Sequence, residues 1–266
     1  MTMNILDKII AHKKKEVGER KSRISVKELE RSASFSAPVH SFKKALLNDE
    51  TGIIAEFKRK SPSKGDINKN ADVAKITVGY SKAGAAALSI LTDHEFFGGS
   101  MGDVITARKV NQIPILRKEF IIDEYQIIEA KAIGADVILL LANVLSPREI
   151  KEFSTTAKFL GLDILLEVRD ESELEAVNIL VDCIGVNNRN LKDFKVDVKQ
   201  SFDLADLIPK GFLKISESGI DSAKTIYELK QAGFNGFLIG ETFMKTPEPE
   251  IACASFIKEI NAYRPI

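Results

Sequence analysis

The chain has 266 residues, which is long enough for a sizeable core and near the upper size of a single domain. Its 38 Lys and Arg residues balance its 38 Asp and Glu residues, so the overall charge indicates neither a nucleic-acid partner nor an anionic membrane. No run of about 18 apolar residues could span a membrane, and early charges interrupt any signal-peptide core, so we expect a cytoplasmic protein.

Residues 1–50 are expected to form a helical N-terminal extension. Ile5, Leu6, Ile9 and Ile10 form an apolar stripe at helical spacing, and the Lys- and Arg-rich remainder is assigned to the solvated face. We interpret this segment as an extra helix that packs on the main domain. A basic contact surface for a ligand or partner is the alternative.

From residue 53 onward, short apolar runs alternate with amphipathic, helix-like segments. Eight runs are interpreted as β-strands: 53–58, 86–92, 114–120, 136–142, 163–168, 183–187, 212–218 and 236–241. The helices between them are indicated by apolar residues at helical spacing and by the candidate N-cap or first-turn residues Asp123, Ser146, Asp170 and Asp221.

Strand–helix alternation of this kind predicts an α/β protein with a parallel sheet. Eight units in about 210 residues is the number found in a (β/α)8 TIM barrel, which we place over residues 51–266. A doubly wound open sheet is the competing architecture. It would more naturally carry a Gly-rich dinucleotide fingerprint after its first strand, and the SPSKG stretch that follows it here is not one.

Polar side chains stand in phase with the inward-facing residues of several predicted strands. Glu56 and Lys58 follow Ile54 on the first strand, and the same phase selects Lys118, Glu167, Asn187 and Glu217 on later ones. Since inward residues at the carboxyl ends of barrel strands face the active-site mouth, we expect these groups to converge there. An ion-pair network that only fastens the barrel is the alternative, but buried charges are costly, which favours catalysis for the set.

Glycines after the seventh and eighth strands indicate an anion site. Gly219 and Gly240 each stand between a strand and a helix, where barrels often bind phosphate through backbone N–H groups, although ordinary tight turns would also use them. Ser61, Ser63 and Lys64 in the first loop could contact the same anion. Together these features predict a small phosphorylated substrate, held at one side of the mouth and acted on by Lys and Glu at the other.

The segment TDHEFFGGS offers two further readings. His94 stands between Asp93 and Glu95, but three consecutive residues cannot readily surround one ion, and we do not expect a metal. The two cysteines are far apart and match no metal spacing. Phe96 and Phe97 either pack within their loop or form an aromatic wall for a planar substrate ring.

Segments spread over nearly the whole chain are similar, in the same order, to the sequence blocks of one enzyme family. They are LDKIIAHKKKEV, SFKKAL, IAEFKRKSPSKG, ALSILTDHEFFGGS, LRKEFIIDEYQI, ADVILLLA, LLEVRDESELE, IGVNNRNL, SESGI and FLIGETFM. On these segments the chain resembles the indole-3-glycerol phosphate synthase family of tryptophan biosynthesis. The resemblance implies a TIM-barrel carboxy-lyase that closes the ring of 1-(2-carboxyphenylamino)-1-deoxyribulose 5-phosphate with loss of CO2 and water. It implies no cofactor and no metal.

The resemblance also implies roles for single residues. Lys118 would be the general acid that protonates the substrate carbonyl, and Glu167 the general base of the later dehydration and proton-loss steps. Lys58 would contact the substrate carboxylate or share the acid role, and which lysine acts at which step stays open. The remaining residues would orient these groups or hold the substrate: Glu56, Asn187, Glu217 and Arg189 around the acid and base, Ser218 on the substrate, Phe97 beside its ring, and Ser61, Gly219, Gly240 and the backbone of Glu241 on the phosphate.

Glu241 departs from the family pattern, in which a serine often follows the glycine of the eighth strand. Because a carboxylate would repel a phosphate, we expect the Glu241 side chain to point away and only its N–H to be used. A phosphoribosyl-type isomerase, an aldolase-type enzyme with a Schiff base at Lys118, and a non-catalytic phosphosugar-binding barrel are the alternatives. Expected partners are a phosphorylated small molecule and, more weakly, other enzymes of the tryptophan pathway.

Overall fold

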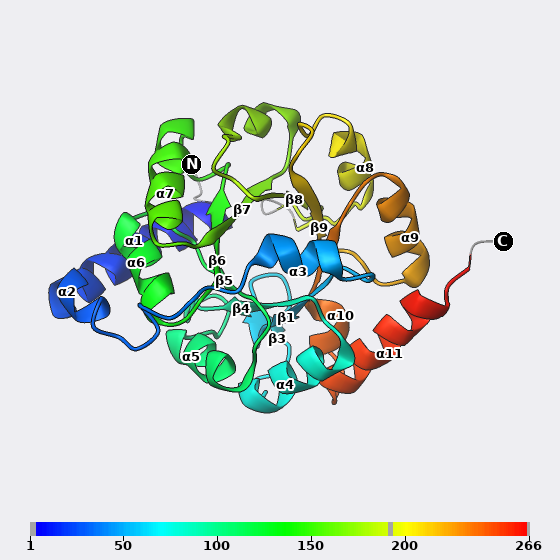
Figure 1. Cartoon of the computed structure of the whole chain (residues 1–266), viewed down its shortest axis with the longest axis horizontal. Helices are drawn as coiled ribbons and strands as arrows, with labels where there is room; N and C mark the ends of the chain where they lie inside the picture. Colours follow the sequence, from blue (N-terminus) through cyan, green and yellow to red (C-terminus); the bar gives the residue numbers. More distant parts are fainter. Residues whose placement is uncertain (1–3, 191–193, 265–266) are drawn as a thin grey trace.

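The computed structural model describes residues 4–190 and 194–264 and contains a closed barrel of eight parallel strands (Figure 1). Around the barrel the strands follow the order β1-β10-β9-β8-β7-β6-β5-β4. Their bounds are β1 (Ile53–Phe57), β4 (Ala87–Leu91), β5 (Ile115–Lys118), β6 (Val137–Leu141), β7 (Asp163–Val168), β8 (Cys183–Asn187), β9 (Leu213–Glu217) and β10 (Gly236–Ile239). The predicted (β/α)8 barrel and all eight predicted strands are therefore confirmed, with strand ends that differ by at most two residues.

Helices surround the barrel on its outer side, as Figure 1 shows. They are α4 (Val73–Ala83), α5 (Met101–Val110), α6 (Glu124–Ala132), α7 (Pro147–Phe159), α8 (Lys199–Ala205), α9 (Ala223–Gln231), α10 (Glu241–Met244) and α11 (Pro249–Ala262), with a 3-10 helix η1 (Glu171–Ala176) after β7. The side chains of Asp123, Ser146 and Asp170 accept hydrogen bonds from first-turn N–H groups, as predicted.

Two local helix predictions are wrong. The segment DESELEAVNIL forms only the short η1, because the β-branched Val177 adopts an extended backbone with φ −64° and ψ 131° and ends it. The N-cap of α9 is Ser222 rather than the preceding Asp221, since the Ser222 hydroxyl accepts the N–H of Thr225. A few residues of the predicted segments lie outside the described residues. They are residues 1–3 of the range 1–50, residues 265–266 of the range 51–266, and Leu191 of the segment IGVNNRNL.

The interior of the barrel is filled by the residues that alternation along the strands predicts to point inward. Ile54, Leu116, Leu165 and Ile215 belong to one buried apolar cluster, as does Leu213. The polar residues two positions further along these strands therefore point inward at the carboxyl ends, where a barrel opens into its mouth.

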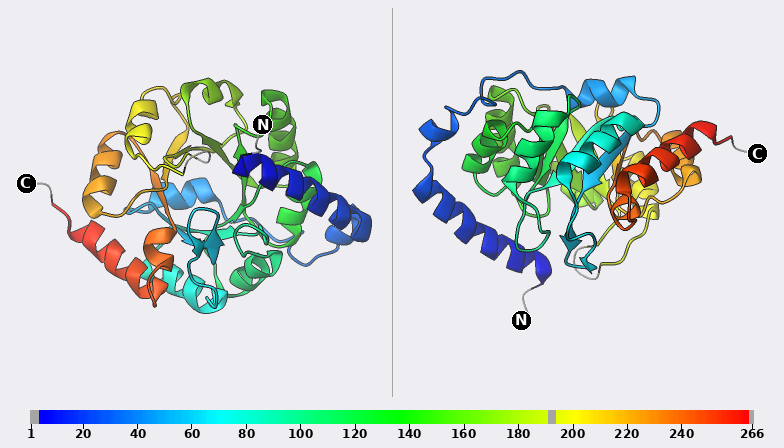
Figure 2. Two further views of the ribbon diagram at one scale, coloured as in Figure 1. Left: turned by 180° about the vertical axis from the view of Figure 1, so that it is seen from behind. Right: turned by 90° about the horizontal axis from the view of Figure 1, so that it is seen from below.

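Three helices precede the barrel: α1 (Ile5–Arg23), α2 (Val26–Leu29) and α3 (Phe42–Asn48). Figure 2 shows α3 at one end of the barrel and the start of α1 at the other end, where the hairpin of β2 (Lys60–Ser61) and β3 (Gly65–Asp66) also lies. Phe42 and Leu46 of α3 join the interior cluster and close that end. The sequence did not indicate the β2–β3 hairpin, because each of its strands has only two residues, too few for a recognisable alternation pattern.

The prediction of a fully solvated basic face on α1 is wrong at Lys13. This side chain is 0% exposed, because three carboxylates surround its ammonium group. Within the described ranges, no helix combines the length and the apolar character needed to cross a membrane.

Candidate active site

A cavity of about 580 Å³ opens at the carboxyl ends of the barrel strands, a volume that suits a small-molecule ligand. The predicted site residues all line it: Glu56, Lys58, Ser61, Phe97, Lys118, Glu167, Asn187, Arg189, Glu217, Ser218, Gly219, Gly240 and Glu241. They come from seven strands or the loops that follow them, so the closed parallel barrel is what brings together positions far apart in the sequence.

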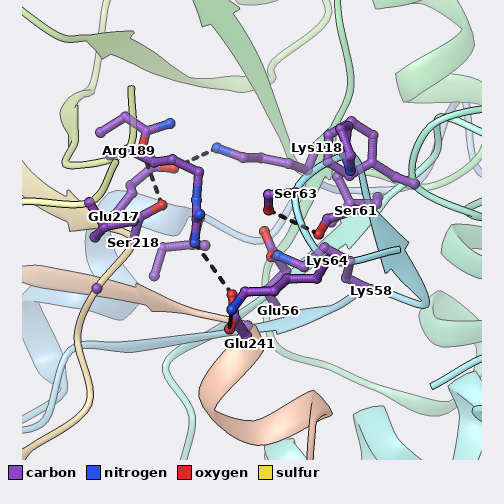
Figure 3. A pocket seen from close by; sticks show the side chains of 18 of the residues that line it. Glu56, Lys58, Ser61, Ser63, Lys64, Lys118, Arg189, Glu217, Ser218 and Glu241 are labelled. Carbon is purple, nitrogen blue, oxygen red and sulfur yellow. Dashed lines mark hydrogen bonds and ion pairs between the residues drawn. The ribbon is translucent and has the colours of Figure 1, made fainter. Parts of the chain in front are cut away.

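Lys118 extends toward Glu217 in the charged part of the cavity (Figure 3). Its Nζ lies 2.8 Å from Oε2 of Glu167 and 2.5 Å from Oε2 of Glu217. The two carboxyl side chains are 5% and 2% exposed, so water screens these ion pairs only weakly. The ammonium group is thus held between two strands, β7 and β9, that face it across the barrel mouth.

The protonation states of these three groups follow from their surroundings. Burial disfavours the ammonium form of Lys118, but the attraction of Glu167 and its neighbouring carboxylates outweighs burial and raises the pKa of Lys118. Burial would likewise raise the pKa of Glu167, but Lys118 and the Asn187 amide lower it below its ordinary value. For Glu217, burial and the nearby Glu167 charge prevail over Lys118 and raise the pKa to about 7.

An amide chain fixes the orientation of Glu167. The Nδ2 of Asn187 donates to Oε1 of Glu167 at 3.0 Å, while its Oδ1 accepts from the Ser218 hydroxyl at 3.1 Å. Ser218 has φ 71°, a left-handed backbone that costs a non-glycine residue energy. A strained residue in a cavity is typical of a functional site, and here the strain aims the Ser218 hydroxyl at the amide.

Lys58 forms a second ion pair just after the end of β1. Its Nζ lies 2.6 Å from Oε1 of Glu56, whose Oε2 accepts from the Ser89 hydroxyl at 3.5 Å. Gly240 makes this arrangement possible, because a Cβ at that position would lie 2.3 Å from Oε1 of Glu56. Gly240, for which the sequence predicts a phosphate contact, therefore has a steric role next to Glu56.

Gly185 is a site-forming residue that sequence reasoning missed. It is in the middle of β8, and a Cβ there would come within 2.5 Å of Oε1 of Glu217. A glycine inside a strand pattern is a signal for close approach of another group, and it could have pointed to this position.

The segments that follow β1, β9 and β10 carry the predicted phosphate contacts, Ser61, Gly219, Gly240 and Glu241. The Glu241 side chain does not point away from this region as expected. Its Oε1 lies 3.3 Å from the Lys64 Nζ and its Oε2 lies 3.3 Å from an Arg189 nitrogen, and both cations line the cavity. The two positive charges offset the repulsion that the sequence reading assigned to this carboxylate.

An apolar wall completes the cavity. Phe97 lies against Phe120 with ring centroids 5.9 Å apart, and both rings line the cavity. Ile5, Leu6 and Ile9 of α1 line it too, so the apolar stripe of the extension does more than pack on the barrel. Periodicity alone could not reveal this, because it identifies an apolar face but not whether that face meets a core or a cavity.

His94 lies in a loop contact, with Nδ1 3.4 Å from the Gly99 carbonyl oxygen. Among residues 4–190 and 194–264, no group of three or more His, Cys, Asp or Glu side chains is arranged to hold a metal ion. The described cavity offers an ammonium donor and carboxylate acceptors, and the cationic side chains of Lys64 and Arg189 also line it.

Comparison with known proteins adds a family to this geometry. The family model described as indole-3-glycerol phosphate synthase matches residues 6–256. A protein of that name from Bacteroides thetaiotaomicron is 48% identical over 258 residues, which cover 97% of this chain and 99% of the relative. Another, from Thermoanaerobacter pseudethanolicus, is 43% identical over 258 residues, covering 96% of this chain and 98% of the relative.

Solved structures resemble the fold at lower identity. A mutant tryptophan synthase alpha-subunit from Pyrococcus furiosus superimposes with a TM-score of 0.61 at 14% identity, covering 81% of this chain and 99% of that one. A second structure of the alpha-subunit from the same organism gives a TM-score of 0.60 at 15% identity with the same coverage. At such identities the likeness shows the barrel fold alone.

Proposed function

The chain belongs to the indole-3-glycerol phosphate synthase family, and from this membership we propose how the residues of its cavity carry out the reaction. Its activity is that of a carboxy-lyase in tryptophan biosynthesis. The substrate we propose is 1-(2-carboxyphenylamino)-1-deoxyribulose 5-phosphate, whose ring closure releases CO2 and water. The family match favours this synthase reaction over the isomerase, aldolase-type and non-catalytic alternatives.

The substrate has three recognition elements, and we propose one part of the cavity for each. The phosphate binds at Ser61, Gly219, Gly240 and the N–H of Glu241, where Lys64 and Arg189 add positive charge. The aromatic ring lies against Phe97, and the ring carboxylate pairs with Lys58. A substrate that spans the mouth from the proposed phosphate contacts to Phe97 would have its carbonyl group near Lys118.

Lys118 acts as the general acid in this scheme. Its raised pKa keeps the ammonium form present at neutral pH, so a proton is available when the substrate carbonyl oxygen begins to gain negative charge. Donation of this proton assists attack of the aromatic carbon on the carbonyl carbon, after which the ring carboxyl group leaves as CO2. The carboxylates that surround Lys118 stabilise the positive charge of the intermediates.

Glu167 acts as the general base of the later steps. Its lowered pKa keeps it ionised and able to accept a proton, and the Asn187 amide holds one of its oxygens while the other faces Lys118. Loss of water then needs a proton donor for the leaving hydroxyl group and an acceptor for the ring proton. Glu56, Glu217, Asn187 and Ser218 orient these groups.

The observation that carries this proposal is the Lys118 ammonium held between two buried carboxylates inside a cavity that the cations Lys64 and Arg189 also line. The purified protein, given the carboxyphenylamino substrate, is expected to produce the fluorescence of an indole product. The matched assay offers phosphoribosylanthranilate, for which no isomerisation is expected. Turnover of the second compound and not the first would overturn the proposal, as would a substrate adduct on Lys118 trapped by borohydride during turnover.

We further propose a single domain, in which the extension over 1–50 packs on the barrel over 51–266. Burial of Phe42 in the barrel interior and of Lys13 against loop carboxylates supports this division. A weak association with other enzymes of the tryptophan pathway and a cytoplasmic location remain part of the proposal. Co-sedimentation of the protein with those purified enzymes tests the association.

A further inference from the structure

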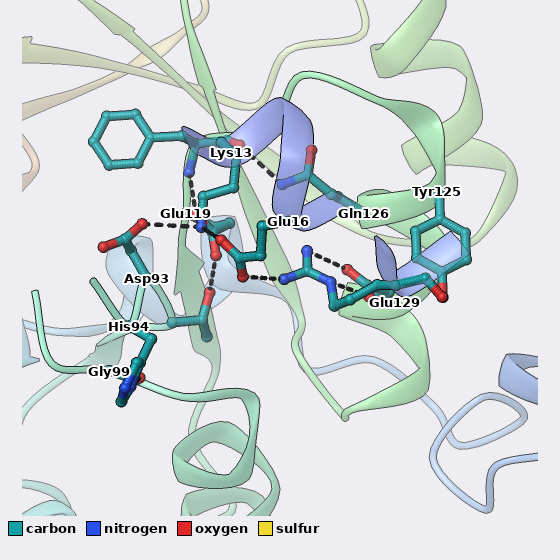
Figure 4. A network of polar contacts seen from close by, with 12 residues as sticks. Lys13, Glu16, Asp93, His94, Gly99, Glu119, Tyr125, Gln126 and Glu129 are labelled. Carbon is teal, nitrogen blue, oxygen red and sulfur yellow. Dashed lines mark hydrogen bonds and ion pairs between the residues drawn. The ribbon is translucent and has the colours of Figure 1, made fainter. Parts of the chain in front are cut away.

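The buried ammonium group of Lys13 connects helix α1 to two loops of the active-site mouth (Figure 4). Its Nζ lies 2.9 Å from Oδ2 of Asp93, in the loop after β4, and 3.0 Å from Oε1 of Glu119, directly after β5. Glu16, one turn further along α1, provides a third contact at 2.7 Å. Lys13 and Glu119 side chains are 0% exposed and that of Asp93 is 1% exposed, so the two loop carboxylates have no access to water as a substitute partner.

Each of these two carboxylates holds the backbone of an aromatic residue. Oδ1 of Asp93 accepts the N–H of Phe96 at 2.7 Å, next to Phe97, and Oε1 of Glu119 accepts the N–H of Phe120 at 2.8 Å. Phe97 and Phe120 are the two rings that contact each other in the cavity wall. The atoms that fix this wall therefore belong to the two carboxylates that Lys13 neutralises.

The two carboxylates depend on Lys13 to different degrees. Oε2 of Glu119 also accepts from the Thr92 hydroxyl at 2.7 Å and lies 3.9 Å from the Arg117 guanidinium group. Within the described ranges, Oδ2 of Asp93 has no hydrogen-bond partner other than the Lys13 ammonium group, 2.9 Å away. Loss of the ammonium group would therefore disturb the Phe96–Phe97 loop more than Phe120.

We propose that Lys13 is a positioning residue for substrate binding, which holds the Phe97–Phe120 wall against the aromatic ring of the substrate through Asp93 and Glu119. This inference rests on the proposed role of Phe97 beside the ring. It assigns to the basic helix α1 a part in ring recognition, beyond the apolar contacts of its first turns. A role limited to fastening α1 to the barrel is the alternative.

Arg20 provides a matched control on the same helix. It binds Glu16 and Glu129, with its Nε 2.8 Å from Oε1 of Glu129, and so fastens α1 to α6 without a contact to Asp93 or Glu119. Glu129 keeps a second cation at 3.3 Å, Arg117, when Arg20 is replaced. Arg20→Met should therefore weaken the attachment of α1 and leave the aromatic wall in place.

The test compares Lys13→Met with Arg20→Met in steady-state assays. For Lys13→Met we expect KM for the carboxyphenylamino substrate to rise about tenfold or more, with kcat changed by less than about threefold, because the ring loses a preformed wall while Lys118 keeps its partners. The inhibition constant of inorganic phosphate, which has no ring, should stay as in the wild type. Lys13→Arg should recover part of the KM change, and Arg20→Met should show the wild-type KM.

A double variant covers the case in which Lys13→Met does not fold. Lys13→Met with Asp93→Asn leaves no unpaired charge at position 93 and keeps an oxygen that accepts the Phe96 N–H. The KM of this double variant should lie between those of the wild type and Lys13→Met. If Lys13→Met does not fold, the KM of the double variant should still exceed that of the wild type. Equal KM changes in the Lys13 and Arg20 variants would overturn the inference, as would weaker phosphate inhibition or a loss confined to kcat. If the wild type itself formed no indole product, the proposed function would fail instead.

Discussion

The pair of carboxylates around Lys118 shows how residues with the same side chain acquire different chemistry. Glu167 and Glu217 lie at nearly the same distance from one ammonium group, yet the Asn187 amide donates to Glu167 alone among the contacts described for the pair. That donor and the ion pair outweigh burial at Glu167, whereas burial prevails at Glu217, so the pKa of Glu167 is lowered while that of Glu217 rises to about 7. One group is ready to accept a proton at neutral pH, and the other is close to its midpoint.

The raised pKa of Glu217 has a consequence for stability. Between the ordinary value of 4.5 and about 7, the folded protein binds a proton at Glu217 that the unfolded chain has lost, so this group's contribution to stability falls as pH rises through the window. Glu217→Gln removes that contribution. Urea unfolding of wild type and variant at several pH values should show the difference in unfolding free energy moving in the variant's favour from about pH 5 to 7. A difference that stays constant with pH would contradict the assignment.

Glu241 gives a prediction about anion binding. Its carboxylate occupies Lys64 and Arg189, so a phosphate must compete with it for these two cations. Glu241→Gln should therefore tighten inhibition by inorganic phosphate by roughly two- to fivefold at low salt, the range expected for partly exposed ion pairs. Glu152→Gln, which removes an exposed carboxylate paired with Arg148, is the control and should leave inhibition unchanged. Weaker inhibition in the Glu241 variant would mean that the carboxylate supports the anion site.

Among the elements, α3 closes the end of the barrel that lies opposite the active-site mouth. Its Phe42 and Leu46 belong to the same cluster as the inward strand residues, while Leu47 on the other face is 58% exposed. The stability of the barrel interior therefore depends on a helix that lies outside the repeating βα units.

Phe42→Ala should lower the free energy of unfolding by about 3–5 kcal/mol, because a fully buried ring is removed from a packed core. Leu47→Ala on the same helix should change it by no more than about 0.5 kcal/mol. Chemical denaturation followed by circular dichroism measures both, and kcat of the folded fraction should be retained, since α3 lies far from Lys118 along the barrel. Equal effects of the two substitutions would refute the packing of α3 described above.

At the scale of elements, the repeating part of the chain could be predicted and the extension only in part. Short apolar runs identified all eight strands, and period-two alternation gave the phase of Glu56, Lys118, Glu167 and Glu217, because sheet geometry ties each side chain to one face. The burial of Lys13 could not be predicted in the same way. Its partners Asp93 and Glu119 are far away in the sequence, and only the folded chain brings them to α1.

For the whole molecule, closure of the parallel barrel is what turns separate sequence signals into one site. The seven strand ends that carry the predicted site residues are spread over residues 56–241, and each taken alone would fit an ordinary ion pair or turn. Convergence in one cavity of about 580 Å³ makes a shared chemical role the better explanation. Sequence spacing could not predict which residues must be small to avoid a steric clash, such as Gly185, which leaves room for the Glu217 side chain.

The central claim is that Lys118 delivers the proton that starts ring closure, and the initial rate of indole product formation by Lys118→Ala tests it most directly. Using indole fluorescence with the carboxyphenylamino substrate, we predict that kcat falls by about 10²-fold or more while KM stays within a few fold of the wild-type value. Phosphate inhibition serves as the check that the variant still binds anions. Turnover at the wild-type rate would contradict the claim, and an effect confined to KM would make Lys118 a binding residue.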